Sequence, residues 1–449
     1  MSTPDTTYLE VPADIDQAGL TALIDAWLEA VPDAQHRAEQ IAELQVPERV
    51  RVLEVLDAEQ VTELLDHASP HAGSDVLDGL PGDLQSRALG LAAPDVVAEI
   101  LRLSPEDEQD ALRGALDVED RSVVETLLAY PEGTVGARMT PRVTAIGGAL
   151  TVREANRAAR AQAADTETIA YVYVVDEDEQ LIGVLSFRDL VLAPGSAIVR
   201  DIMDTDLLSV QVDTDQEAAG RLLIANHLFA LPVVDHGRLV GIITSDDVAD
   251  IIDEEGTEDA ERQGGSAPLD LPYLRASPWL LWRKRIIWLL VLFVAEAYTG
   301  TVLRHFEEEL EAVVALSFFI PLLIGTGGNT GTQITSTLVR AMAIGEVRLR
   351  DMGRVLIKEL SAGSMIAITM ALAAIIRAWT LGVGWEVALT VTLTVAAIVL
   401  WSSFIGSVMP LLLRRVGLDP AVVSAPMIAT IVDGTGLVIY FEIAKVILF

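Results

Sequence analysis

The chain contains no cysteine, only three lysines and few aromatic residues. Without cysteine there are no disulfides, no thiolate metal ligands and no thiol nucleophile. No Ser/His/Asp grouping or other catalytic constellation stands out in the rest of the sequence. We therefore do not expect an enzyme.

Long apolar runs are absent from the first 275 residues, and the charge changes at the same point. Residues 1–275 contain 18 basic and 54 acidic side chains, whereas residues 276–449 contain 13 and 12. A mean hydropathy of +0.40 beside a net charge of −35 therefore indicates an acidic soluble part joined to a nearly neutral membrane part. Such a field repels nucleic acid and concentrates cations, although solvation or a salt-adapted host explains most of these carboxylates.

Five apolar runs follow, each long enough, at about 20 residues or more, to cross a bilayer as a helix. The second run is interrupted by Pro321 and a glycine cluster. The five predicted spans lie near residues 285–304, 312–340, 355–378, 387–413 and 421–448.

The orientation of these spans follows from their flanking charges. Basic residues precede the first span and gather after the second and fourth, whereas Glu307, Glu308 and Glu309 lie in an opposite loop. Positive charge favours the cytoplasmic side, and the first 30 residues lack the basic and apolar regions of a signal peptide. We expect a multi-pass protein of the plasma (inner) membrane, with its soluble part in the cytoplasm and its C-terminus outside.

The region up to residue 130 shows apolar positions at three- and four-residue spacing in short blocks, which is typical of helices. Residues 48–56 and 96–101 are two such blocks. Prolines separate the blocks, several followed by an acidic residue, as at helix starts. This predicts an acidic N-domain built as a stack of short helices similar to an α-solenoid, with an interaction or sensing role.

The next region contains an internal repeat with a period of about 60 residues. Strands are predicted at residues 170–175 and 181–185, and their counterparts at 230–235 and 239–243. Each copy then ends in Gly-x-x-[Ser/Thr]-x-x-Asp, at the start of a helix. This α/β duplication resembles a tandem CBS pair, or Bateman module.

In CBS pairs the hydroxyl residue caps the helix, and the aspartate can reach the ribose of an adenine nucleotide. Capping alone also explains a Ser or Thr at a helix start, so both roles remain open. ATP or another adenine nucleotide is a candidate regulatory ligand. Its candidate contacts are Ser186, Arg188, Asp189 and Thr244.

A run of carboxylates links this module to the first span. Asp246, Asp250 and Asp253 share one predicted helical face, and Asp247 and Glu254 share another. Like charges at this spacing destabilise a helix by a few tenths of a kcal/mol per pair. Solvent and salt, or bridging divalent cations, must offset that repulsion, and oxygen ligands suit Mg²⁺ or Ca²⁺.

The last span carries a carboxylate, Asp433, about 18 Å along a helix starting at Ala421 and thus close to mid-membrane. The nearest basic residue is Lys445. A carboxylate at that depth is costly unless it faces a cavity, a partner or an ion. It predicts a cation or proton site, and a protonated, hydrogen-bonded aspartate joining two helices is the alternative.

The second span contains a segment rich in glycine and threonine, with Asn329 and Gln333 one turn apart. No strand precedes it and no lysine follows at the P-loop position, so phosphate binding is not expected. In a membrane the glycines predict close helix approach and exposed backbone carbonyls. Neutral oxygens suit Mg²⁺ that keeps its water shell, while helix packing is a compatible second role. Asn329 and Asp433 are expected at similar depth in one pore.

Two membrane segments carry a resemblance to a known family. Residues 321–334 (PLLIGTGGNTGTQI) and 433–441 (DGTGLVIYF) resemble the MgtE family of magnesium channels, and so does the domain order over essentially the whole chain. The predicted parts are an acidic helical N-domain (1–130), a tandem CBS pair (131–252), a connecting helix and linker (253–278) and a five-helix transmembrane domain (279–449).

The resemblance implies a homodimer in the lipid bilayer with a central Mg²⁺ pore. In it, Asp433 is the main pore carboxylate, and the region around Asn329, with Gln333 and Thr430, adjoins the same pore. Cytosolic Mg²⁺ bound between the N-domain, the CBS pair and the connecting helix closes the gate. The predicted regulatory ligands are Asp246, Asp247, Asp250, Glu254, Glu258 and Asp259.

We therefore expect gated, passive Mg²⁺ influx, with other divalent cations as further candidates and no nucleic acid as partner. Two alternatives remain open. One is an ion-coupled divalent-cation transporter or exporter, in which Asp433 relays protons or Na⁺. The other is a membrane-anchored nucleotide sensor that conducts nothing.

Overall fold

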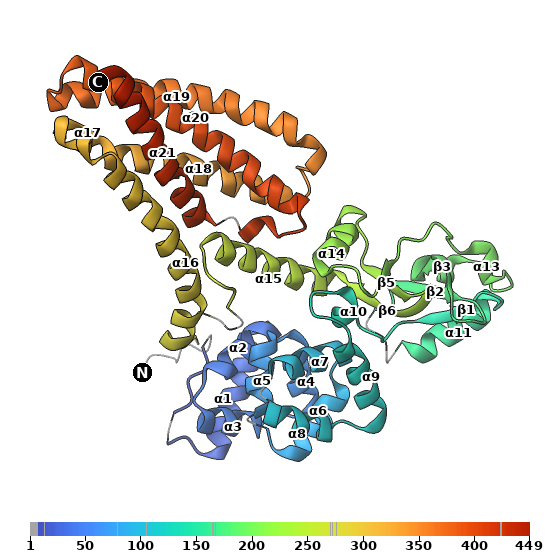
Figure 1. Cartoon of the computed structure of the whole chain (residues 1–449). Helices are drawn as coiled ribbons and strands as arrows, with labels where there is room; N and C mark the ends of the chain where they lie inside the picture. The colour runs from blue at the N-terminus through green and yellow to red at the C-terminus, as the bar shows by residue number, and fades with distance from the viewer. Residues whose placement is uncertain are drawn as a thin grey trace. The chain divides into compact units, whose positions relative to one another are not determined.

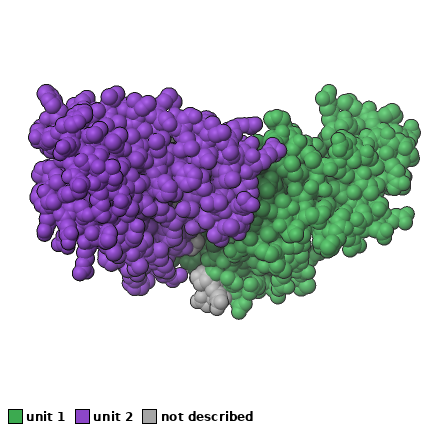
Figure 2. All heavy atoms as spheres, turned by 45° about the horizontal axis from the view of Figure 1, so that its top comes forward, with its two compact units in different colours: residues 1–253 green, residues 254–449 purple. Residues whose placement is uncertain are grey.

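The structure is a computed structural model, and it divides into two compact units (Figure 2), Met1–Asp253 and Glu254–Phe449. Each unit has a hydrophobic core of its own. The described residues are 8–12, 14–78, 80–104, 106–163, 166, 168–269, 271, 273–274, 276–422 and 424–449. Residues 270, 272 and 275 of the predicted linker therefore lie outside the described residues.

The N-domain is a stack of short helices in which several helices pack on a helix two or three places further along the chain (Figure 1). This confirms the superhelical arrangement that the apolar periodicity predicted. The helices are α1 (Gln17–Ala30), α2 (Ala34–Glu43), α3 (Val46–Leu53), α4 (Ala58–His67), α5 (Pro70–Asp78), α6 (Gly82–Leu91), α7 (Pro94–Leu103), α8 (Glu106–Ala115) and α9 (Val118–Ala129).

Part of the surplus acid in this domain has a structural role at helix starts. Asp16, Asp33, Asp57 and Asp117 are the N-caps of α1, α2, α4 and α9, and each side chain accepts a backbone N–H of the first turn. Such a cap is worth about 1 kcal/mol, and its negative charge also suits the positive end of the helix dipole. These aspartates therefore need no metal to explain them.

The CBS region contains two three-stranded sheets, ordered β1-β2-β3 and β4-β5-β6. In each, the first strand pairs parallel with the second, and the second and third form an antiparallel hairpin. The strands are β1 (Ala145–Gly147), β2 (Tyr171–Val175), β3 (Leu181–Ser186), β4 (Val210–Gln211), β5 (Ala230–Asp235) and β6 (Arg238–Thr244). The helices are α10 (Val135–Arg138), α11 (Val152–Gln162), α12 (Phe187–Leu192), α13 (Val199–Ile202) and α14 (Gln216–Ala225).

The two repeats exchange the segments that lead into them. Thr140, before the first repeat, pairs with Ile242 of β6 through two hydrogen bonds of 2.9 Å. Asp204, before the second, pairs with Val184 of β3 in the same way, also at 2.9 Å. A Cβ at Gly183 or Gly241 would collide with the methionine of the incoming segment. The glycine of each repeat signature is therefore needed for this exchange.

Five long helices form a bundle in the second unit, in which α18 packs on α20 and α21, α20 on α19, and α16 on α21 (Figure 1). Short turns join them: α17 (Glu307–Ala312), η1 (Val314–Phe319), η2 (Leu349–Asp351) and η3 (Pro420–Val422). The long helices are α16 (Pro278–His305), α18 (Ile320–Ala343), α19 (Met352–Leu381), α20 (Trp385–Arg415) and α21 (Ala425–Leu448).

Among the described residues, four segments are long and apolar enough to cross a membrane: Pro278–His305, Val314–Ala343, Leu349–Leu381 and Trp385–Arg415. The fifth helix, α21, is not one of the four. It has 24 residues and carries Asp433, Glu442 and Lys445. Its packing against α16, α18 and α20 nonetheless makes it part of the same bundle.

The glycine cluster lies inside α18 without breaking it, because Pro321 occupies the first turn, where proline is tolerated. The backbone carbonyls of the cluster therefore belong to a continuous helix, and the prediction that they are exposed was wrong. Close approach does occur. A Cβ on Gly327 would lie 2.7 Å from Val432, and one on Gly331 would lie 2.6 Å from Ile428, both on α21.

We predict that Gly331→Ala destabilises the membrane unit by about 1–3 kcal/mol, because the added methyl group forces α18 and α21 apart. The matched control is Gly325→Ala on the same helix, where no described atom lies within 4 Å of the added Cβ. Thermal unfolding of the detergent-solubilised chain measures the difference. Equal melting temperatures for the two variants would contradict the packing role.

Candidate functional site

Asp433 lies in the middle of α21, on the side where that helix meets α18. A Cβ on Gly328 of α18 would lie 3.5 Å from its Oδ1 atom, and Gly434 beside it is buried. Oδ1 is itself buried, and no hydrogen-bond partner for it exists among the described residues. A carboxylate that served only to join helices would donate or accept a hydrogen bond here, so its environment favours a ligand of another kind.

The other predicted pore residues lie around this point on two helices. Asn329 follows Gly328, where α18 approaches Asp433, and both Asn329 and Gln333 are exposed on one side of α18. Thr430 is half-buried on α21, one turn before Asp433. The intervening Thr330 points into the bundle and donates to the Thr326 carbonyl at 2.8 Å. The amide side chains thus face outward from this chain and remain open to water or to a second copy.

A second carboxylate near Asp433 was missed from the sequence. Glu296 of α16 is exposed and close enough to Asp433 for their carboxyl groups to interact electrostatically. It lies within the first predicted span, so the rule that singled out Asp433 also applied to it. Its proximity to Asp433 could not be known before α16 was placed against α21.

The predicted regulatory carboxylates all lie on one helix, α15 (Ser245–Gln263), which contains the boundary between the two units. Asp246 and Asp250 are exposed. Partial desolvation by neighbouring groups, together with repulsion from Asp246 and Asp253, raises the pKa of Asp250 above its ordinary value. Negative charge on this face is thus unfavourable, as the helical spacing predicted.

Asp247 differs from its neighbours, because it already has partners. Its Oδ2 atom accepts the Thr244 N–H at 3.0 Å and the Thr244 hydroxyl as well. Burial raises the pKa of Asp247, while these two hydrogen bonds act in the opposite direction. The pair is one half of a capping box at the start of α15, a structural role that the sequence prediction of a metal ligand had not considered.

Within the second unit, an arginine joins the end of α15 to the loop before α21. Arg262 donates to Glu258 at 2.6 Å and to Asp419, in the loop between α20 and α21, at 2.8 Å. Burial and the negative charge of Asp419 raise the pKa of Asp259 beside this bridge. The connecting helix and the start of the Asp433 helix are therefore electrostatically coupled.

A second arginine lies at the N-domain side of the CBS pair. Arg138 of α10 forms an ion pair with Glu99 of α7, and its Nε donates to Gln216 of α14 at 3.4 Å. Its charge also acts on Asp250 and opposes the increase in the pKa of that carboxyl. Arg138 thus offsets part of the negative charge of Glu99 and Asp250.

The six predicted regulatory ligands do not converge. Within the part of the chain that the structure describes, no three His, Cys, Asp or Glu side chains form a group that could hold a metal ion. Carboxylate oxygens nevertheless suit a hard cation that keeps most of its water, as Mg²⁺ does. A cation at α15 would therefore be held through water or by donors on a second surface.

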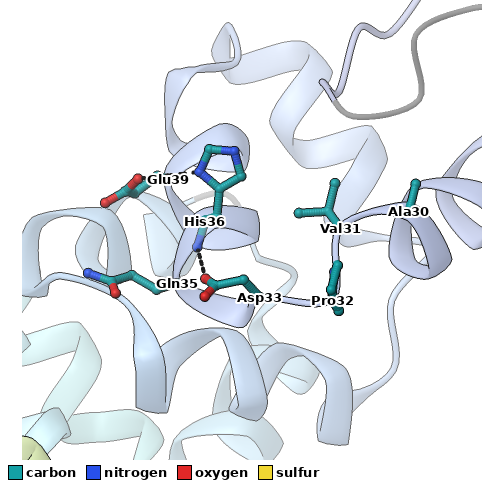
Figure 3. A pocket seen from close by; sticks show the side chains of 7 residues that line it. All are labelled: Ala30, Val31, Pro32, Asp33, Gln35, His36 and Glu39. Atoms are coloured by element: carbon teal, nitrogen blue, oxygen red, sulfur yellow. Dashed lines mark hydrogen bonds and ion pairs between the residues drawn. The ribbon is translucent and has the colours of Figure 1, made fainter.

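The predicted nucleotide contacts are also explained by capping. Ser186 accepts the Asp189 N–H at 3.1 Å and donates to Asp189 Oδ2 at 2.5 Å, and Thr244 bonds to Asp247. Arg188 is exposed. A shallow hollow between α1 and α2 (Figure 3) is no better a ligand site, because Asp33 there accepts the His36 N–H at 2.7 Å as an N-cap.

The fold and the site together define a membrane transport protein with a soluble helical domain and a CBS pair. Family models match in the same order: the MgtE intracellular N domain over residues 33–133, the CBS domain over 134–195 and 199–254, and the MgtE divalent cation transporter over 320–443. The chain belongs to the MgtE family, as the two membrane segments predicted, and the prediction that it is not an enzyme is confirmed.

Relatives match over nearly the whole chain. Magnesium transporter MgtE of Thermus thermophilus is 39% identical over 414 residues, which are 90% of this chain and 91% of that protein. The Bacillus subtilis protein of the same name is 30% identical over 401 residues, 88% of each. A crystal structure of the cytosolic domain of the Mg²⁺ channel MgtE in complex with ATP is 37% identical, with a TM-score of 0.49, over 53% of this chain and 95% of that one.

We predict that Asp247→Ala lowers the stability of the soluble unit by about 1 kcal/mol in the absence of Mg²⁺, because it removes the acceptor for the Thr244 N–H. Asp246→Ala is the control, since that side chain is exposed. We expect it to change stability by less than about 0.5 kcal/mol. Thermal unfolding without divalent cations compares them, and an unchanged Asp247→Ala protein would contradict the capping role.

Proposed function

We propose that this protein is a Mg²⁺ channel in which Asp433 holds the ion during its passage. The observation that carries the proposal is the buried Oδ1 atom of Asp433, which has no hydrogen-bond partner among the described residues. A desolvated carboxylate oxygen is costly without a donor or a cation. Both full-length relatives described above are named magnesium transporters, which supports Mg²⁺ as that cation.

A homodimer supports this function better than one chain does. Mg²⁺ takes six oxygen ligands, dehydrates reluctantly and is usually held by one or two carboxylates plus water. A two-fold axis beside α21 would bring two copies of Asp433 to one hydrated ion. The exposed amides of Asn329 and Gln333 would then line the same passage, with Thr430 one turn from Asp433.

Cytosolic Mg²⁺ closes the channel in this proposal through the carboxylates of α15. The raised pKa of Asp250 and of Asp259 supports this proposal, because it indicates that negative charge is unfavourable on this helix. Bridging Mg²⁺ would offset the repulsion between these carboxylates. It would also favour the arrangement of the helix for which it has the higher affinity, by about 1–3 kcal/mol per coupled site. The Arg262–Asp419 ion pair carries that change to the start of α21.

The domain division proposed from the sequence fits this mechanism. The parts 1–130, 131–252 and 253–278 would sense Mg²⁺ in the cytoplasm, and 279–449 would conduct it with the C-terminus outside. ATP or another adenine nucleotide at Ser186, Arg188, Asp189 and Thr244 would act only as a modulator. Passive influx, rather than ion-coupled transport or export, is the mode of transport that we propose.

We predict that Asp433→Asn and Asp433→Ala lower Mg²⁺ uptake into proteoliposomes by about ten-fold or more, because an ion contact to a charged group is worth about 1.5–3 kcal/mol. The matched control is Glu442→Gln, an exposed carboxylate on the same helix. It should leave uptake unchanged. Undiminished flux through both Asp433 variants would refute the pore assignment, and flux that requires a proton or Na⁺ gradient would indicate coupled transport.

We predict that Asp246→Asn and Asp250→Asn raise the Mg²⁺ concentration that closes the channel by at least about five-fold, since each removes charge that bridging Mg²⁺ must offset. Patch-clamp currents at stepped cytosolic Mg²⁺ measure the threshold. Asp25→Asn on α1 is the control, because that carboxylate is equally exposed and far from α15 in sequence. A threshold equal to that of the control would contradict regulation by α15.

A further inference from the structure

The first membrane helix contains a carboxylate that the proposed pore residues do not explain. Glu296 lies in α16, whose membrane segment has a mean hydropathy of 2.0. Its neighbours are apolar, in the sequence Val-Leu-Phe-Val-Ala-Glu-Ala-Tyr. An ionisable side chain at such a position is costly in lipid, so it faces water, a partner or an ion.

The register between α16 and α21 places Glu296 level with Asp433. Trp288 Nε1 donates to Ser424 Oγ at 3.1 Å, and further along the Phe306 and Phe441 rings stack at 4.7 Å between centroids. These pairs are separated by 136 and 135 residues, so the helices run parallel in constant register. Glu296 therefore lies opposite the turn of α21 that contains Asp433, and the two carboxyl groups interact electrostatically.

Thr299, one turn after Glu296, provides an independent sign of a ligand. The side chain is only 6% exposed, and its Oγ1 atom has no hydrogen-bond partner among the described residues. Other hydroxyls of the bundle donate to the carbonyl one turn back, as Thr301 does at 3.1 Å. Thr299 Oγ1 instead faces α21, 3.3 Å from where a Cβ of Gly434 would lie.

Three oxygen-bearing side chains thus lie along the contact between α16 and the middle of α21. Glu296 and Thr299 come from one side and Asp433 from the other, and two of the three have a buried, unpartnered oxygen. The absence of a side chain at Gly434 lets Tyr298 and Thr299 of α16 pack closely against α21. Carboxylate and hydroxyl oxygens together suit a hard divalent cation that keeps part of its water shell.

We propose that Glu296 and Thr299 of α16 form, beside Asp433, a second binding position for the permeating divalent cation. This inference rests on the proposed pore function and adds a helix to the ion pathway. Glu296 attracts the hydrated ion, and Thr299 offers its oxygen to the water shell. Two neighbouring positions of this kind favour conduction, because ions at adjacent sites repel one another and leave readily.

The test measures Mg²⁺ uptake into proteoliposomes containing the full chain, over a series of external Mg²⁺ concentrations. We expect Glu296→Gln, which removes the charge and keeps the shape, to raise the half-saturating concentration at least about five-fold. Thr299→Val should produce a smaller shift, Thr299→Ser should behave like the parent, and Glu296→Asp should fall between Glu296→Gln and the parent. Glu442→Gln on α21 is the matched control and should not shift.

Several results would overturn the inference while leaving the pore assignment intact. Glu296→Gln saturating at the parent concentration, alongside an inactive Asp433→Asn, would place Glu296 outside the pathway. Uptake that needs a pH gradient in the parent but not in Glu296→Gln would make the residue a proton relay. If Glu296→Gln does not fold, as judged by gel filtration, the saturation curve of Glu296→Asp decides. An active Asp433→Asn channel would instead refute the proposed function itself.

Discussion

The energetic cost of a negative charge inside an apolar bundle is the constraint on which the membrane unit depends. A desolvated carboxylate needs a donor, water or a cation, and Asp433 has an oxygen with no protein partner among the described residues. The surrounding helices are built to bring this group close to others. Gly327, Gly328 and Gly331 let α18 approach α21, and Gly434 lets α16 do so. The glycines that let the helices pack closely thus also bring Asp433 close to the neighbouring helices.

The soluble unit treats its many carboxylates in different ways. Several aspartates cap helices and are satisfied by backbone N–H groups, and Asp247 belongs with them. Arg138 forms an ion pair with Glu99, and Arg262 forms one with Asp419 of the second unit. The carboxylates that remain exposed on α15, such as Asp246 and Asp250, repel one another. These are the carboxylates on which the proposed response to a divalent cation depends.

Much of the fold could be predicted, because it depends on local patterns. The apolar spacing and the proline positions predicted the helical N-domain, and the internal repeat predicted two equivalent sheets. The cost of a charge at mid-membrane depth singled out Asp433. Predictions about which atoms face one another were less successful. The prediction of exposed backbone carbonyls was wrong because α18 continues as a helix through its glycines. The structural role of Asp247 was missed because the sequence pattern of a carboxylate at a helix start is the same whether the carboxylate binds a metal ion or a backbone N–H.

The amino-acid sequence was enough to predict the family, the division into an acidic soluble part and an apolar part, and the presence of a costly carboxylate in the last span. The family follows from the two membrane segments and the domain order that resemble MgtE proteins, and the other two features follow from composition and the cost of charge in lipid. The positions of Glu296 level with Asp433 and of the Thr299 hydroxyl facing α21 became known only from the packing of the helices. Such pairings depend on the register of two helices that are about 130 residues apart in the chain, and nothing local in either helix fixes that register.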